Sequence, residues 1–386
     1  MWMFILKRLG QMVLVFYIFL ALLYSLLLAQ PGGLENQFVG NPDIPPEAKQ
    51  ELIERLGLDQ PPHLQVLSYM WNVTTGDLGV SWSQYPEPVA SVLWDALPRT
   101  LYLFLLATIL AYVVGFVSGK LVAWRRDTMT EKVVLTSSIF LWTVFYPWFA
   151  LLMLWFFGVQ LGWFPLGKFI TVEKWLSAPY DADSVFLLMM GSAVAAAVAY
   201  LGAWYLIRRN TQDWDTRRTR SRWAAAGIAV VFAAFWAVNP RGEWALDIVW
   251  HSVIPVVTLT LVAYASTTLL TRTSMIETVK EDYILTARAK GVPDKTIRDR
   301  HASRNALLPV VTSLVLALAT VIGGGVITES IFSWPGIGLE LLRAITLEDV
   351  PLAMGALSFI AVLSLLAHLV ADILYAVLDP RIRVQG

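Results

Sequence analysis

Residues 101–123 read LYLFLLATILAYVVGFVSGKLVA, and Lys120 is the only charged side chain in this run. A helix needs about 20 predominantly apolar residues to cross the hydrocarbon layer of a bilayer. Inside that layer every backbone N–H and C=O must find its partner within the segment, which a helix achieves. The stretch therefore predicts a membrane-spanning helix.

The same pattern recurs along the whole chain of 386 residues, 57% of which are hydrophobic and 15% charged. A soluble domain carries about 25% charged residues, so an ordinary soluble enzyme, a disordered chain and a nucleic-acid binder are excluded. We predict an all-α polytopic membrane protein with eight spans, at residues 9–29, 101–123, 133–157, 184–207, 223–238, 248–270, 309–331 and 351–378. The fifth of these is the shortest.

The distribution of basic residues predicts the orientation, because Lys and Arg concentrate in the cytoplasmic loops of membrane proteins. Lys plus Arg and Asp plus Glu are both 29, so the net charge is zero. With the N-terminus inside, 21 basic residues fall in the inside segments and 7 in the outside segments. We therefore expect both termini to be cytoplasmic and an even number of spans.

The first span, residues 9–29, follows a basic start, as a secretory signal peptide would. Its apolar run exceeds the roughly 7–15 residues of a signal core, and Leu27-Leu28-Ala29 is a poor cleavage site. We expect a permanent anchor. The chain has no cysteine, which excludes disulfides, thiolate metal sites and cysteine nucleophiles.

Residues 30–99 form the longest predicted outside segment, with nine acidic and three basic side chains. Pro45-Pro46 before EAKQELIERLG indicates one helix that Gly57 ends, and a second is expected from His63 to about Asn72. The turn residues Gly76, Asp77 and Gly79 follow. We expect a small folded cap; the alternative is a solvated loop without a role.

The largest inside segment, residues 272–308, is predicted to hold two helices separated by Gly291-Val292-Pro293. Gly291 can take the left-handed conformation that ends a helix, and Pro293 suits the first turn of the next. Eight basic and five acidic residues are mixed here, whereas a lipid-binding patch would be almost entirely basic. The mixture favours docking against a protein; the alternative is an amphipathic loop without a partner.

Residues 282–312 read DYILTARAKGVPDKTIRDRHASRNALLPVVT, which closely resembles the cytoplasmic coupling motif of ABC importer permeases of the dipeptide, oligopeptide and nickel group. ELIERLGLDQP at 51–61, GDLGVSW at 76–82, ESIFSWPGIG at 329–338 and DILYAVLDPRIR at 372–383 are also similar to that family. The likeness covers the first three and last three spans.

The resemblance implies a six-helix permease core, to which residues from about 165 to 245 add two inserted spans. It divides the chain into a tail and first span (1–29), the outer cap region (30–99) and the permease domain (100–386), which contains the coupling loop 272–308. The coupling helix is expected near 284–296. The residues that match the coupling motif are Asp282, Tyr283, Thr286, Ala287, Arg288, Ala289, Lys290, Gly291, Arg300, His301, Arg304, Asn305 and Pro309.

The resemblance also implies partners: a second homologous permease subunit, two cytoplasmic ABC ATPase subunits, an extracytoplasmic solute-binding protein and the lipid bilayer, with no nucleic acid. The chain has no G-x-x-x-x-G-K-[ST] phosphate loop, so we expect no enzyme activity and no cofactor of its own, with ATP and Mg²⁺ bound by the ATPase subunits. The implied function is import of di- or oligopeptides in the cell membrane.

Several alternatives stay open on the sequence. The same architecture imports oligosaccharides or nickel in some members of the family, and Leu347-Glu348-Asp349-Val350-Pro351 departs from the R-D-Y-P stretch usual there. An ion-driven secondary carrier would show inverted repeats with broken helices, and we find no such repeat. A membrane protease would need HExxH or a nucleophile paired with a base in the spans, and the sequence has neither.

Four further features are candidate sites. Glu329, Ser330 and Trp334 are candidates for an outer gate, although Glu329 could instead reach the membrane interface. His368 and Asp372 lie four residues apart on one helix face, where a hydrogen-bonded pair is favoured over a proton relay or a metal site. Gly323-Gly324-Gly325 would allow close helix packing. The histidines (His63, His251, His301 and His368) are scattered, so we predict no metal site.

Overall fold

The computed structural model describes residues 2–29, 60–321 and 325–378. Within these ranges the regular elements are helices, apart from one isolated β-bridge between Val80 and Pro88. The predicted helix after Pro45-Pro46 lies outside the described residues. The elements are α1 (Trp2–Leu28), α4 (Pro62–Thr75), α5 (Val89–Trp124), α6 (Met129–Thr143), α7 (Tyr146–Met153), η1 (Leu154–Gln160), α8 (Val172–Trp175), α9 (Ala182–Asn210), α10 (Trp214–Val238), α11 (Gly242–Thr278), α12 (Asp282–Ala289), α13 (Asp294–Thr296), η2 (Ile297–Ala302), α14 (Ser303–Val321), α15 (Val326–Ile331), α16 (Ile337–Thr346) and α17 (Val350–Leu378).

Seven helices in the described part of the chain are long and apolar enough to cross a membrane, or eight if one bent pair counts as a single span. The predicted all-α polytopic fold is therefore confirmed. The helix containing residues 101–123 is longer than predicted and begins at Val89. The helix expected from His63 to about Asn72 is confirmed as α4, which ends at Gly76 in a left-handed conformation (φ 84°).

The third predicted span, residues 133–157, is not one straight helix. Helices α6 and α7 meet at a bend of 110°. Val144 has an extended backbone, and Pro147 follows in the first turn of α7. Proline has no N–H with which to continue the helical ladder, so α6 ends before it.

The bounds predicted for the seventh span, residues 309–331, are also wrong. Helix α14 begins at Ser303 and ends at Val321, and α15 is a separate helix of six residues that starts after Gly325. Glu329 therefore lies in a short helix and not at the end of a spanning one. Of the three consecutive glycines, only Gly325 is among the described residues.

The pair of spans predicted to be an insertion differs most from the prediction. The segment 208–222, expected to be a loop, is largely helical, because α9 extends to Asn210 and α10 starts at Trp214. The Asp213 carboxylate caps α10 by accepting a hydrogen bond from the Thr216 N–H over 2.8 Å. Arginine is a good helix former, so the basic residues extend both helices beyond the apolar runs.

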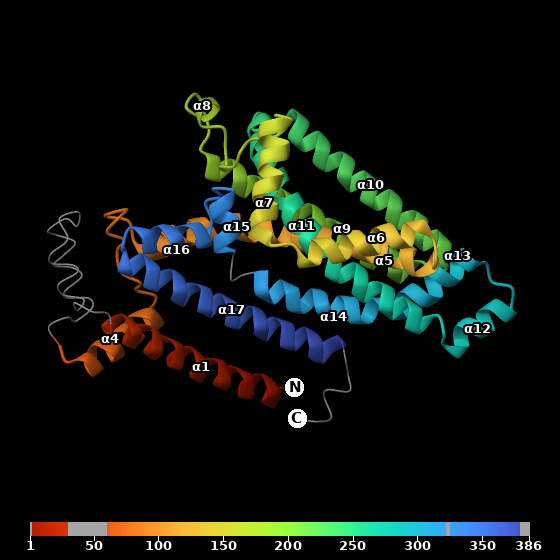
Figure 1. The fold of residues 1–386 in the computed structure, drawn as a ribbon, viewed down its shortest axis with the longest axis horizontal. Helices are drawn as coiled ribbons and strands as arrows, with labels where there is room; N and C mark the ends of the chain where they lie inside the picture. The colour runs from red at the N-terminus through yellow and green to blue at the C-terminus, as the bar shows by residue number, and fades with distance from the viewer. Residues whose placement is uncertain (1, 30–59, 322–324, 379–386) are drawn as a thin grey trace. The chain divides into compact units, whose positions relative to one another are not determined.

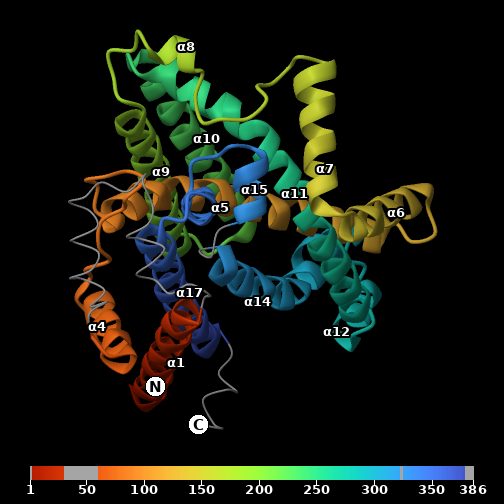
Figure 2. The same cartoon turned by 60° about the vertical axis from the view of Figure 1, so that its left-hand side comes forward.

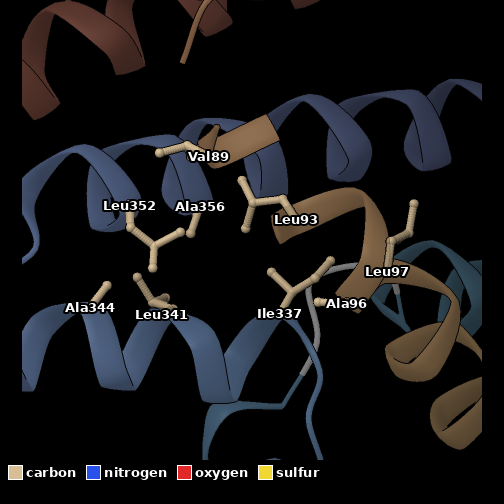
Figure 3. Packing of buried hydrophobic residues seen from close by; sticks show 9 residues of the cluster. All are labelled: Val89, Leu93, Ala96, Leu97, Ile337, Leu341, Ala344, Leu352 and Ala356. Atoms are coloured by element: carbon tan, nitrogen blue, oxygen red, sulfur yellow. The ribbon is translucent and has the colours of Figure 1, made fainter. Parts of the chain in front are cut away.

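The chain divides into two compact units, residues 1–153 with 255–386, and residues 154–254. In the first unit, α1 lies beside α4 and α17, while α5 contacts α14, α16 and α17 (Figures 1 and 2). Figure 3 shows one of its cores, where aliphatic side chains from α5, α16 and α17 interdigitate: Val89, Leu93, Ala96, Leu97, Ile337, Leu341, Ala344, Leu352 and Ala356. In the second unit, α9 and α10 pack as a hairpin.

Candidate functional site

Helix α12 lies against the ends of longer helices through one apolar face. Ile284 is fully buried and Ala287 is 8% exposed. They pack with side chains from α5, α11 and the η2–α14 segment: Ala123, Met275, Ile297, Ala302 and Ala306. This packing links the position of α12 to the ends of three helices of the first unit.

The turn after α12 has the predicted geometry. Gly291 has φ +72°, the left-handed conformation that a Cβ disfavours. The N–H of Val292 donates to the carbonyl of Ala287 over 3.2 Å, which closes the helix end. Pro293 then precedes α13, which continues through η2 into α14. The single coupling helix expected near 284–296 is therefore two pieces separated by this turn.

Most residues of the predicted coupling motif are exposed on this segment. Ala287 is the buried exception, and His301 is half-buried. The Asn305 amide donates to the Tyr283 hydroxyl over 2.9 Å, which joins α12 to α14. Partial burial raises the pKa of Tyr283, so this hydroxyl stays neutral. The exposed members are Asp282, Tyr283, Thr286, Arg288, Ala289, Lys290, Gly291, Arg300, Arg304, Asn305 and Pro309.

Leu285 is a surface residue that the sequence did not single out. Its side chain is 54% exposed, whereas its neighbour Ile284 is fully buried. Apolarity alone does not distinguish the two residues; only the packing of α12 shows which one faces outward.

A partly buried ion pair connects this segment to α5, and the sequence analysis did not predict it. Lys120 Nζ lies 3.1 Å from Asp299 Oδ1, and both side chains are about one-fifth exposed. Arg298 binds the same carboxylate with two hydrogen bonds of 2.9 and 3.0 Å. The lone charge in the apolar run 101–123 was the available signal, since a charge in a span needs a partner.

A second ion pair joins α11 to α6. Arg272 donates from Nη2 to Glu131 Oε1 over 2.6 Å, and Glu131 is 6% exposed. The other carboxylate oxygen of Glu131 accepts from the N–H of Asp127 over 2.6 Å, at the start of α6. The two ion pairs thus join η2 to α5, and α6 of the bent pair to α11.

At the other end of the first unit, Glu329 is buried and holds the segment after α15. Its Oε1 accepts from the Thr100 hydroxyl over 2.9 Å, and its Oε2 accepts from the N–H of Leu339 over 3.0 Å. Glu329 is fully buried, so the alternative that it reaches the membrane interface is wrong. A Cβ at Gly338 would lie 2.8 Å from the Val326 nitrogen, which explains the glycine there.

The other two gate candidates are also involved in local contacts. Trp334 is fully buried, and its indole N–H donates to the carbonyl of Arg99 over 3.0 Å. The Ser330 hydroxyl donates to the carbonyl of Val326 within α15. The three residues gather where the segment after α15 meets α5, and a gating role for them stays a prediction.

The segment before α5 is anchored on Asp349, which the sequence analysis did not name as a candidate site. This carboxylate is fully buried and accepts hydrogen bonds of 2.6 Å from the hydroxyls of Ser81 and Ser83. It also caps α17 by accepting from the N–H of Leu352 over 3.1 Å. The motif GDLGVSW at 76–82 therefore packs on the start of α17.

His368 and Asp372 do not pair with each other, so that expectation was wrong. His368 Nδ1 contacts the carbonyl of Ser364 at 2.7 Å, and its side chain is exposed. Asp372 accepts a hydrogen bond from Arg8 Nε at 2.5 Å, which joins α17 to α1. The aspartate has a structural contact with a helix far away in the sequence.

No group of three or more histidine, aspartate or glutamate side chains within residues 2–29, 60–321 and 325–378 is arranged to hold a metal ion. His251 Nδ1 contacts the carbonyl of Asp247 at 2.8 Å, a contact within one helix.

Long apolar helices joined by partly buried ion pairs define a multi-pass membrane protein. Residues 223–384 match the family described as binding-protein-dependent transport system inner membrane component, and that match contains both the coupling motif and the 329–338 motif.

Relatives of known name match almost from end to end. The di/tripeptide transport system permease protein DppB of Pseudomonas aeruginosa is 31% identical over 382 residues, covering 99% of each chain. The dipeptide permease DppB of Escherichia coli K12 is 31% identical over 380 residues, covering 98% of each. The oligopeptide permease AppB of Bacillus subtilis is 29% identical over 359 residues, covering 93% of this chain and 92% of AppB. The chain belongs to this family of inner-membrane permease components.

Proposed function

We propose that this chain is one of two permease subunits of an ATP-driven importer that carries di- or oligopeptides from an extracytoplasmic binding protein into the cell. The observation that carries the proposal is the packing of α12: its buried face contacts the ends of α5, α11 and the η2–α14 segment, while most of the motif residues are exposed. Peptide as the cargo rests on the names of the relatives.

The energy comes from two ATPase subunits, because this sequence has no phosphate loop. Closure of the ATPase pair moves α12, and the pairs Lys120–Asp299 and Arg272–Glu131 carry that motion to α5 and α6. ATP shifts the permease between inward-open and outward-open states because its binding energy differs between the two.

A pair of matched leucine variants tests the docking surface. Leu285→Glu changes a leucine that is 54% exposed on α12, and Leu67→Glu changes one that is 59% exposed on α4. Because neither side chain belongs to a core, both variants should fold. We expect the complex with Leu285→Glu to lose its ATPase subunits on purification and the Leu67→Glu complex to keep them. Equal retention of ATPase subunits by both complexes would contradict the proposal.

The cargo is tested in cells that lack other peptide uptake. We expect a labelled dipeptide or oligopeptide to enter only when this chain, its partner subunits and the binding protein are all present. Uptake of a labelled oligosaccharide or of ⁶³Ni²⁺, with no uptake of peptide, would instead support the alternative cargoes.

A further inference from the structure

A pocket of about 350 Å³ lies between α9 and α10, within the second unit. Its wall combines aromatic and basic side chains: Trp204 from α9, and Trp214, Arg217, Arg218, Ser221 and Arg222 from α10. The coupling segment belongs to the other unit, so the proposed function leaves this pocket unexplained.

The basic side chains are held in place by the hairpin. Arg217 donates from Nη2 to the Thr211 carbonyl over 2.6 Å, and the Arg218 guanidinium lies 5.3 Å from the Trp214 ring centroid. Arg218 and Arg222 are four residues apart, so they share a helix face. Among the described residues that line the pocket none is acidic, so its charge is positive.

The position of the pocket along the hairpin points to the lipid headgroup region. Arginines lie in the last turn of α9 and near the N-terminal end of α10. At this end of the hairpin the apolar run of α9 has ended and that of α10 has not yet begun. Tryptophan beside arginine is typical of the membrane–water interface. The distribution of basic residues assigns this end to the cytoplasmic side, where the membrane surface carries anionic lipids.

Beyond the pocket, α10 presents apolar side chains to its surroundings. Trp223 is 73% exposed, Val230 67% and Val231 70%, and none of the described residues of α10 is buried. A ligand with an anionic head and long acyl chains would match the basic pocket and this apolar helix at once. A soluble phosphate compound or an acidic protein segment would match only the pocket.

We propose that this pocket binds the phosphate group of an anionic phospholipid. Arg217, Arg218 and Arg222 supply the donors, Ser221 adds a hydroxyl, and the acyl chains lie along α10. Arginine is suited to this task because its planar guanidinium can donate two parallel hydrogen bonds to one phosphate.

The test measures lipid binding to the full chain in complex with its partner subunits. The detergent-purified complex is stripped of lipid and titrated with phosphatidylglycerol or with phosphatidylcholine of the same acyl chains, and bound lipid is counted by native mass spectrometry. The variants are Arg218→Ala/Arg222→Ala, the charge-conserving Arg218→Lys/Arg222→Lys, and a control of equal charge loss outside the pocket, Arg125→Ala/Arg126→Ala.

We expect tighter binding of phosphatidylglycerol than of phosphatidylcholine. Each basic contact with an anionic lipid contributes about fivefold in affinity, so the double alanine variant should bind phosphatidylglycerol about 25-fold more weakly. The Arg125/Arg126 control should retain binding, and the lysine variant should bind with an affinity between those of the control and the double alanine variant, because lysine keeps the charge but not the two parallel hydrogen bonds.

Three outcomes would overturn the proposal. One is equal phosphatidylglycerol binding by the wild-type chain and the double alanine variant. A second is displacement of the lipid by millimolar glycerol phosphate, which would indicate a site for a soluble phosphate compound. The third is loss of the ATPase subunits from the double alanine variant with unchanged lipid binding, which would identify a protein-docking surface instead.

Discussion

At the scale of single residues, Glu329 and Gly291 illustrate two ways in which one position determines local structure. Glu329 acts through its side chain, because its two carboxylate oxygens bind the hydroxyl of Thr100 and the N–H of Leu339. Gly291 acts through its backbone, because it adopts φ +72° without a side chain. Each position gives a separate prediction.

Glu329→Gln should destabilise the segment after α15. An amide has one acceptor oxygen, so either the Thr100 hydroxyl or the Leu339 N–H loses its buried partner, which costs about 1–3 kcal/mol. The thermal unfolding midpoint of the detergent-solubilised complex should fall. Glu87→Gln is the control, since Glu87 is exposed, and it should leave the midpoint unchanged. Equal midpoints for the two variants would show that the Glu329 contacts do not stabilise the fold.

Gly291→Trp should uncouple transport from ATP hydrolysis while the membrane helices stay folded. A Cβ at this left-handed position costs about 1–2 kcal/mol. Apart from the adjoining residues, no atom lies within 4 Å of that Cβ, so within this chain the indole would point into open space. We expect normal expression, weaker association of the ATPase subunits and loss of uptake.

Gly291→Asn separates the effect of backbone strain from that of an indole blocking the docking surface, because asparagine tolerates the left-handed conformation. It should keep ATPase binding and uptake. Full uptake by the tryptophan variant with its ATPase subunits bound would exclude Gly291 from the coupling surface.

At the scale of elements, partly buried ion pairs join helices that are far apart in the sequence. Lys120 on α5 and Asp299 on η2 are far apart in the sequence but lie in contact beside Arg298. Removing Asp299 leaves the partly buried Lys120 charge without this partner, which is more costly than the bond itself is worth, whereas removing Lys120 leaves Asp299 paired with Arg298.

Lys120→Met and Asp299→Asn should each reduce uptake, and their effects should not add. Contacting residues show interaction energies of about 0.5–3 kcal/mol in double-mutant cycles, so the double variant should resemble the worse single variant. The measurements are uptake and unfolding midpoint, with Lys132→Met as an exposed control. Additive losses would mean that the pair does not link α5 to the coupling segment.

The α9–α10 hairpin should be dispensable for the transport path. Arg241, which follows α10, lies 4.9 Å from the ring of Tyr180, which precedes α9, so the two ends of the hairpin lie side by side. Replacing residues 182–238 by a short Gly/Ser linker should leave measurable uptake. A deletion variant that assembles with its partners but shows no uptake would contradict this peripheral role.

At the scale of the whole molecule, the distribution of basic residues predicts both termini in the cytoplasm and residues 30–99 outside. The chain has no cysteine, so single cysteines can be introduced without a background. Glu87→Cys and Asn210→Cys lie at exposed positions on opposite predicted sides. An impermeant thiol reagent applied from outside should label only Glu87→Cys. Labelling of Asn210→Cys alone would reverse the topology.

Hydrophobic runs and motif spacing determined much of this protein from the sequence by itself. They predicted an all-α membrane fold, the helix beginning near His63 and the left-handed turn at Gly291. Each of these depends on local physical chemistry, such as the length of an apolar run or the conformational freedom of glycine. The permease family was indicated by the resemblance of residues 282–312 to the coupling motif.

Tertiary structure alone decided the partners of the charged groups. Lys120 pairs with Asp299, Asp372 with Arg8, and Asp349 with Ser81 and Ser83, across separations of up to 364 positions. Only the structure shows that α14 ends at Val321, and that Ile284 is buried while Leu285 is exposed. The physical reason is that a buried charge must have a partner, but which one depends on helices that only packing brings together.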